Sequence, residues 1–181
     1  MVDGYLFDTN VISALYNPGH ENHSPFWDRF RLLPGDAPFF VSSISLGEFS
    51  FGRCWVLKEH PELGRPFDQF VGKHFPKALD VSRHTKECYG TIRAALFRRF
   101  SPMHKKGRAK YPEHLIDGVT SHSLGIQEND IWLAAQAVER RLVFVTNDGK
   151  MLNRMREIAD SDGEFKGQEW CSASDSSRTD E

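Results

Sequence analysis

Four acidic residues of this sequence stand where a parallel sheet could bring their side chains together: Asp8, Glu48, Asp130 and Asp148. Asp8 follows the apolar run at 5–7 and opens a helical pattern, and Asp148 follows the apolar run at 142–145 in the same way. Both acids therefore lie at the carboxyl ends of expected strands, which is the edge where open α/β sheets bind ligands.

Three of these acids have a simple structural explanation when each is taken alone. Asp8 and Asp148 have the residue type that caps the start of a helix. Asp130 falls in the first turn of an expected helix, where a negative charge interacts favourably with the helix dipole. We expect Asn129 to cap that helix, which would leave the Asp130 side chain free to point outward.

Glu48 belongs to an S-x-x-E sequence that starts at Ser45 and has the form of a capping box. We expect the helix to begin earlier, at 42 or 43, so that Glu48 falls in its second turn. Carboxylates brought together repel one another and raise one another's pKa unless a cation neutralises them. Oxygen ligands without a cluster of Cys or His suit Mg²⁺, or Mn²⁺, rather than Zn²⁺. The sequence therefore predicts one or two such ions, at a site suited to phosphate chemistry.

Short apolar runs alternate with helical patterns along the chain. Runs at 5–7, 38–41 and 142–145, and a weaker one at 165–170, are typical of buried strands. Helical spacing covers 9–16, 26–33, 44–57, 67–74, 83–100, 130–140 and 148–158. This alternation predicts an α/β fold, with a parallel sheet flanked by helices on both faces. On the helices, we expect Trp27, Trp55 and Trp132 to lie in the core.

Length and composition suit a globular chain. With 181 residues we expect one domain at 1–170, followed by a disordered acidic tail at 171–181. The formal charge of −2 averages a basic stretch at 88–112 against an acidic one at 157–181, so it does not exclude nucleic-acid binding. Three cysteines without a CxxC motif, no secretory leader and no apolar run long enough to span a bilayer predict a cytoplasmic protein without membrane segments.

Four motifs in order carry a resemblance to a known family: FDTNVISAL, VSSISLGEF, NDIWLAAQA and LVFVTND. Together they resemble the PIN-domain ribonucleases, and more narrowly the VapC-type toxins of bacterial toxin–antitoxin pairs. The match spans about residues 4–152 and rests on four features of the family. They are the D-T-N after the first strand, the Glu after a Ser-rich strand end, the Asp that heads an alanine-rich helix and the Asp after a strand ending in Thr.

The resemblance implies a PIN-like α/β/α fold and a metal-dependent endoribonuclease acting on single-stranded or looped RNA. It also implies a homodimer and, for a toxin, inhibition by a small antitoxin protein. Asp8, Glu48 and Asp130 would hold one or two Mg²⁺ (or Mn²⁺) ions, with Asp148 binding directly or through water. Polar neighbours would position these ligands or the water from outside: Thr9, Asn10, Thr146 and Asn147.

The chain departs from the short toxins by an insertion at about 98–125, which is rich in basic residues. These cations could bind RNA phosphates beside the acidic site: Arg98, Arg99, Lys105, Lys106 and Arg108. A solvated surface insertion without contact to RNA is the alternative.

Other functions remain open from the sequence. The D-T-N motif loosely resembles the haloacid-dehalogenase phosphatases, but these need a second Asp where this chain has Asn10. A Rossmann nucleotide-binding protein is disfavoured because no GxGxxG or P-loop motif occurs. A PIN nuclease that processes RNA without being a toxin, and a catalytically silent PIN interaction module, are the remaining alternatives.

Overall fold

The structure is a computed structural model that describes residues 3–56, 64–101, 109–159 and 165–170. At its centre lies a five-stranded, all-parallel sheet with the strand order β3-β2-β1-β4-β5. The strands are β1 (Tyr5–Phe7), β2 (Phe39–Ser42), β3 (Lys77–Leu79), β4 (Val143–Thr146) and β5 (Lys166–Glu169). In this order the chain builds outward in one direction from β1 and then returns to β1's other side, so the topological switch point lies between β1 and β4.

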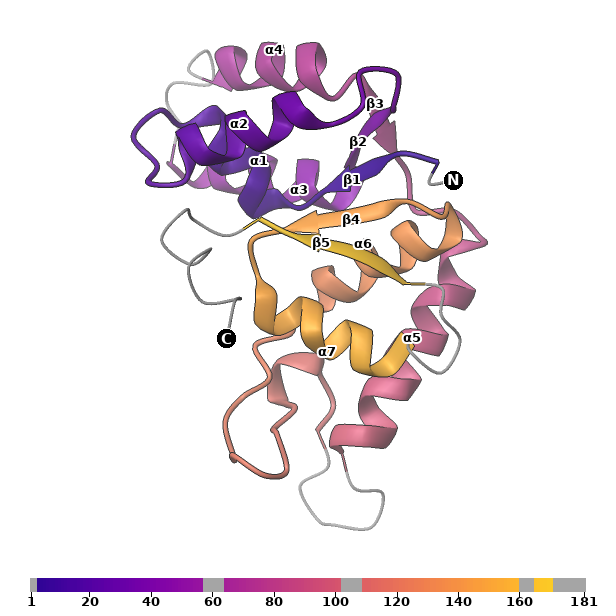
Figure 1. Cartoon of the computed structure of the whole chain (residues 1–181). Helices are drawn as coiled ribbons and strands as arrows, with labels where there is room; N and C mark the ends of the chain where they lie inside the picture. Colours follow the sequence, from indigo (N-terminus) through magenta and orange to yellow (C-terminus); the bar gives the residue numbers. More distant parts are fainter. Residues whose placement is uncertain (1–2, 57–63, 102–108, 160–164, 171–181) are drawn as a thin grey trace, which may run out of the picture.

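Helices cover both faces of the sheet (Figure 1). One face packs against α1 (Thr9–Tyr16), α2 (His23–Leu32) and α4 (Arg65–His74), and the other against α5 (Thr85–Phe100), α6 (Glu128–Glu139) and α7 (Gly149–Ala159). Helix α3 (Ser43–Val56) directly follows β2. The predicted α/β class is thereby confirmed.

Successive side chains of the central strands point to opposite faces of the sheet and so divide the core into two halves. Leu6 of β1 and Phe144 of β4 are fully buried on the side of α5, α6 and α7. Their neighbours Phe7 and Val145 are fully buried on the opposite side. Strands buried on both faces in this way are expected for a parallel sheet between two helical layers, and they hold the carboxyl ends of β1 and β4 side by side.

The predicted elements agree with the structure to within about three residues at their ends, and the weak strand at 165–170 is confirmed as β5. Strand β3 was not predicted. It has only three residues, Lys77, Ala78 and Leu79, and none of them is aromatic or β-branched. Its pairing with β2 along the sheet edge, and not its own sequence, makes it a strand.

The insertion contributes to the core. Beyond a 3-10 turn at Pro112–His114, Leu115, Leu124 and Ile126 are buried against α5, α6 and α7, and Ile116 pairs with Ser123 in an antiparallel bridge. The described part of the insertion is therefore anchored, although Val119 at its tip is 94% exposed. The rest of the basic loop and the predicted tail at 171–181 lie outside the described residues.

Of the three tryptophans expected in the core, Trp27 is half-buried and packs against the core, whereas Trp132 is half-buried and stacks on Tyr89 with the ring centroids 3.8 Å apart. The expectation was wrong for Trp55, whose side chain is 79% exposed on α3, where it stacks on the exposed ring of Phe51 with the centroids 6.2 Å apart. Helical spacing identifies an apolar stripe on α3, but it does not show whether other elements cover that stripe. In the described residues, no helix has both the length and the apolar character needed to cross a membrane.

Candidate active site

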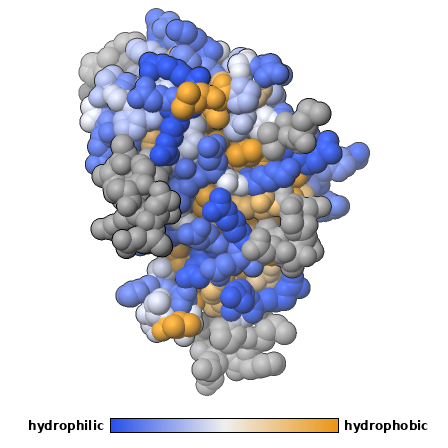
Figure 2. Space-filling view, in the orientation of Figure 1, coloured by the Kyte–Doolittle hydropathy of each residue, from blue (hydrophilic) through white to orange (hydrophobic). Residues whose placement is uncertain are grey.

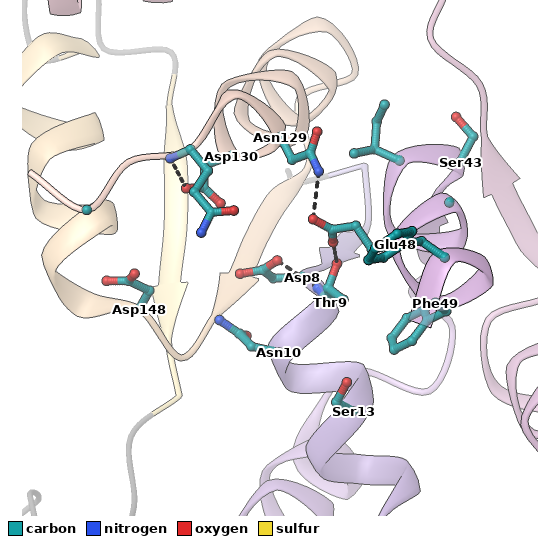
Figure 3. Close-up of a pocket in the computed structure, with 15 residues that line it drawn as sticks. Asp8, Thr9, Asn10, Ser13, Ser43, Glu48, Phe49, Asn129, Asp130 and Asp148 are labelled. Carbon is teal, nitrogen blue, oxygen red and sulfur yellow. Dashed lines mark hydrogen bonds between the residues drawn. The ribbon is translucent and has the colours of Figure 1, made fainter. Parts of the chain in front are cut away.

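The four predicted acids line one open cleft of about 960 Å³ at the switch point between β1 and β4 (Figure 3). Asp8 follows β1, Asp148 follows β4, Glu48 comes from α3 and Asp130 from the first turn of α6. The cleft is lined by oxygen- and nitrogen-bearing side chains on its floor, and its described lining contains no Lys, Arg or His. Side chains up to 140 residues apart in sequence are thus gathered at one edge of the sheet.

Asp8 is the most deeply placed of these acids, with only 6% of its surface exposed. Its Oδ1 accepts a hydrogen bond of 2.7 Å from the backbone N–H of Thr9, so it caps α1, and its Oδ2 accepts one of 2.7 Å from the Thr146 hydroxyl. Burial raises the pKa of Asp8 to about 6, against the effect of both hydrogen bonds, and the charges of Glu48 and Asp148 add to the increase.

Thr146 connects three parts of the site through one hydroxyl. This buried oxygen donates to Asp8 and accepts from the backbone N–H of Asp148 at 3.0 Å and from the Asn10 amide at 3.3 Å. The Asn10 carbonyl oxygen in turn accepts from the backbone N–H of Asn147 at 3.2 Å. These contacts tie the end of β4 to the first turn of α1 and fix the distance between the two strand ends.

Glu48 lies in the second turn of α3, as expected, and does not form a capping box. The helix starts at Ser43, and the hydroxyl of Ser42 accepts the N–H of Ile44. The Glu48 carboxylate instead accepts a hydrogen bond from the Thr9 hydroxyl and one of 2.7 Å from the Asn129 side-chain amide. It therefore bridges α1 and α6 across the cleft (Figure 3).

Asp130 differs from the expectation in its local role. Asn129 was expected to cap α6, but the N-cap is Gln127, and Asp130 Oδ2 accepts the backbone N–H of Gln127 at 2.7 Å in a capping box. The expectation was wrong because the helix begins at Glu128, before the apolar pattern does. Burial, followed by the nearby charges of Asp8, Asp148 and Glu48, raises the pKa of Asp130 to about 7.

Asp148 is a helix cap and a cleft residue at once. Its Oδ1 accepts the backbone N–H of Met151 at 2.9 Å in the first turn of α7, and its side chain lines the cleft. Asp8, Asp130 and Asp148 thus act as helix-capping residues, Glu48 does not, and all four line the same cleft.

Two of the five predicted RNA-contact residues lie in the described part of the chain, and neither lines this cleft. Arg98 and Arg99 are exposed in the last turn of α5 and do not line it, and Arg99 lies 3.7 Å from Glu157. Lys105, Lys106 and Arg108 lie outside the described residues. Whether any of them contacts RNA stays a prediction.

Sequence reasoning missed the contribution of Asn129 to the site. The residue was interpreted as a cap, whereas its amide holds Glu48. Its position one residue before the predicted ligand Asp130 was the available signal, but contact with α3 depends on how the two helices pack, and that is a tertiary property.

The donor set fits a hard divalent cation. Asp8 is buried and Asp130 is half-buried, and the pKa of each is raised by burial and by the charges of the other acids, as expected of carboxylates without a neutralising cation. Within the described residues, no three Asp, Glu, His or Cys side chains converge closely enough to hold an ion as they stand. By the type of their ligand atoms, these carboxylates suit Mg²⁺ or Mn²⁺ better than Zn²⁺, which favours Cys and His.

Several solved structures contain a chain with a similar fold. The chain is similar to one in the crystal structure of VapBC-1 from nontypeable Haemophilus influenzae (TM-score 0.64, 19% identity, 92% of this chain and 97% of that chain). It is also similar to a chain in the crystal structure of VapBC2 from Rickettsia felis bound to a promoter DNA fragment. That match has a TM-score of 0.63 and 19% identity, and it covers 92% of this chain and 98% of that chain. A third similar chain is in the crystal structure of FitAcB from Neisseria gonorrhoeae, with a TM-score of 0.60 and 20% identity. The match covers 83% of this chain and 92% of that chain.

No protein-family model and no curated protein sequence matches the chain. The comparisons therefore show that the fold is shared with chains of the VapBC and FitAcB structures.

Proposed function

We propose that this chain is a metal-dependent endoribonuclease and the toxin of a toxin–antitoxin pair. The observation that carries the proposal is the convergence of Asp8, Glu48, Asp130 and Asp148 in one cleft at the switch point of the sheet. The fold shared with VapBC and FitAB proteins supports it.

The four carboxylates would hold one or two Mg²⁺ or Mn²⁺ ions. When bound, such an ion supplies Lewis-acid activation of water and neutralises charge on the phosphate being cleaved. The chain's own polar residues keep the carboxylates in place: Thr146 holds Asp8, and Thr9 and Asn129 hold Glu48. Because each of these bonds fixes a rotamer, the acids are oriented before any substrate arrives.

RNA is the substrate that suits this arrangement best. The cleft is open and lies at the molecular surface, so an extended or looped strand can pass across it without a deep pocket for a single small molecule. The described lining offers no Ser–His pair, which disfavours a hydrolase that works through a serine nucleophile.

A protein partner is supported by the surface of α3. Phe51 and Trp55 are 70% and 79% exposed and stack on each other, and Phe51 also lines the cleft. Exposed aromatic pairs of this kind mark protein interfaces. The structural neighbours VapBC and FitAB are themselves two-protein complexes, so we propose that an antitoxin covers this patch beside the cleft. Homodimerisation and a cytoplasmic location belong to the same proposal.

Cleavage assays with the full chain test the enzyme. Purified protein with Mg²⁺ or Mn²⁺ is incubated with a panel of structured and unstructured RNAs, beside the nearly isosteric variant Asp8→Asn. We expect metal-dependent cleavage by the wild type and a loss of at least 100-fold in the variant, as for a removed ligand. Equal rates for the two proteins would mean that the enzyme proposal is wrong.

The toxin role has its own test. Induction of the wild type in a bacterial host should arrest growth, co-expression of a small protein encoded beside it should relieve the arrest, and Asp8→Asn should cause none. Cleavage without growth arrest would instead favour an RNA-processing nuclease. Metal binding without cleavage would favour the silent interaction module.

A further inference from the structure

A second hollow adjoins the acid cleft and shares two of its walls, Asn10 and Asp148. This hollow, here called the amide hollow, has a volume of about 630 Å³ and is lined by Asn10, Asn147, Asp148, Gly149, Lys150, Asn153 and Glu169. It lies over the start of α7 and the end of β5, on a face that is predominantly hydrophilic in Figure 2. Its volume is within the range of pockets that hold a ligand the size of a nucleotide.

The chemistry of this hollow is that of hydrogen bonding. Amides offer donors and acceptors together, and a carboxylate offers acceptors only. In the described residues, the side chains of Asn147, Asn153 and Glu169 make no hydrogen bond to the protein, and Lys150 makes no ion pair. By contrast, Asn10 is committed to Thr146 and Asn147. Unused polar side chains gathered beside a candidate catalytic cleft are available to a substrate.

Gly149 gives Glu169 its position in this hollow. A Cβ at residue 149 would lie 2.2 Å from Glu169 Oε1, so the carboxylate rests against the bare backbone of the first residue of α7. Glu169 itself is the last residue of β5 and pairs with Thr146 in the sheet. The sheet register therefore sets the Glu169 carboxylate next to the turn that carries Asp148.

Lys150 and Asn153 also line a third hollow of about 420 Å³, beside the insertion. Two acids there, Asp117 and Glu157, are ion-paired with Arg154, whereas Lys150 is exposed. The acid cleft shares Asn10 and Asp148 with the amide hollow, and the amide hollow shares Lys150 and Asn153 with this third hollow. Because the described cleft lining has no cation, the attraction for a polyanion must come from residues beyond it, such as Lys150.

We propose that the amide hollow binds the base next to the cleaved phosphate and sets the sequence preference of the enzyme, an inference that rests on the proposed ribonuclease function. Asn153 and Glu169 contact the base edge, and Lys150 holds the following phosphate. A carboxylate acceptor favours a base with an exocyclic amino group, and Asn pairs best with adenine. Adenine, cytosine and guanine carry such an amino group and uracil does not, so we expect uracil to be disfavoured and adenine to be preferred.

Sequencing of the cut sites in a randomised single-stranded RNA pool tests this assignment. The wild type should cut with the amino-bearing bases, adenine first, preferred over uracil by about fivefold or more at one position flanking the cut. Glu169→Gln should relax the discrimination against uracil, because the new amide can donate to the uracil O4. Asn153→Ala should weaken the preference as well, because it removes the side-chain amide that we assign to the base edge.

Lys150→Ala tests the phosphate contact. It should raise KM about threefold to tenfold and reduce the slope of log affinity against log salt by about 0.7, the value for one phosphate contact on a single strand. Lys86→Ala, which removes an exposed lysine from the first turn of α5 and from none of the three hollows, is the matched control. An equal effect of both lysine variants would reduce the result to net charge and overturn the assignment of Lys150.

These outcomes distinguish the inference about base preference from the ribonuclease proposal. RNA cleavage by the wild type with no base preference, or a preference that Glu169→Gln and Asn153→Ala leave unchanged, overturns the inference and leaves the ribonuclease proposal intact. Absence of cleavage by the wild type, under conditions where the protein is folded and metal is present, overturns both.

Discussion

The Thr146 hydroxyl donates a hydrogen bond of 2.7 Å to Oδ2 of Asp8, and the two residues are 138 positions apart. They meet because β1 and β4 are adjacent, parallel and in register, with Phe7 opposite Val145. The deepest acid of the candidate site is thus held by the next strand of the sheet as well as by the Thr9 backbone N–H of its own segment.

Loss of this hydroxyl should reduce both stability and activity. Thr146→Val keeps the shape but leaves a buried carboxylate oxygen without its donor, which costs about 1–3 kcal/mol. We expect metal affinity or cleavage rate to fall about 10- to 100-fold, measured by metal titration and RNA cleavage. Thr146→Ser, which retains the oxygen, should recover most of the loss; a Val variant with full activity would contradict the role given to Thr146.

Asn129 should matter for metal binding although it is not one of the acids. Asn129→Ala removes the 2.7 Å bond to Glu48 Oε1 and frees the Glu48 side chain to change rotamer. We expect metal affinity to fall about tenfold, in an isothermal titration with Mn²⁺. The control is Ser13→Ala, in the same cleft but without a side-chain hydrogen bond in the described residues, and it should bind metal like the wild type.

Stability of the metal-free protein should fall as the pH rises from about 4 to 8. The folded-state pKa values of Asp8 and Asp130 are raised from 3.8 to about 6 and about 7. In this range the native state therefore binds more protons than the unfolded state, and the free energy of unfolding decreases with pH. Urea unfolding with EDTA at a series of pH values measures the slope. Asp130→Asn, which stays neutral, should flatten it, and a wild type whose stability rises over this range would refute the prediction.

Added metal should reverse this loss. An ion that binds only the folded state stabilises it by about 2.7 kcal/mol at a concentration 100 times its Kd. It competes with protons for the same carboxylates, so the increase in Tm on adding Mg²⁺ should be larger at pH 8 than at pH 5. Thermal unfolding scans check this, and Asp8→Asn should reduce the increase at both pH values.

The exposed aromatic pair on α3 should affect association without affecting the fold. Trp55→Ser removes a side chain that is 79% exposed, and surface substitutions of this kind usually change stability by less than about 0.5 kcal/mol. We expect unchanged cleavage of RNA by the isolated protein and at least tenfold weaker inhibition by a cognate antitoxin. Inhibition as strong as for the wild type would exclude Trp55 from the interface.

The sequence by itself determined which residue types carry the chemistry and which strands and helices carry them. Apolar runs too short for helices identified β1, β2 and β4, and Asp8 and Asp148 could be placed at strand ends because a strand followed by a helix puts the junction at the sheet edge. These are local properties, in which a residue's neighbours along the chain decide its position.

The tertiary structure alone decided the partners of those residues. The contact of Asn129 with Glu48 and the exposure of Trp55 depend on how helices from distant segments pack. Strand β3 has no aromatic or β-branched residue to predict it, and it forms because it pairs with β2 at the edge of the sheet. Hydrophobic spacing reports which face of a helix is apolar, but what meets that face is set by the whole chain.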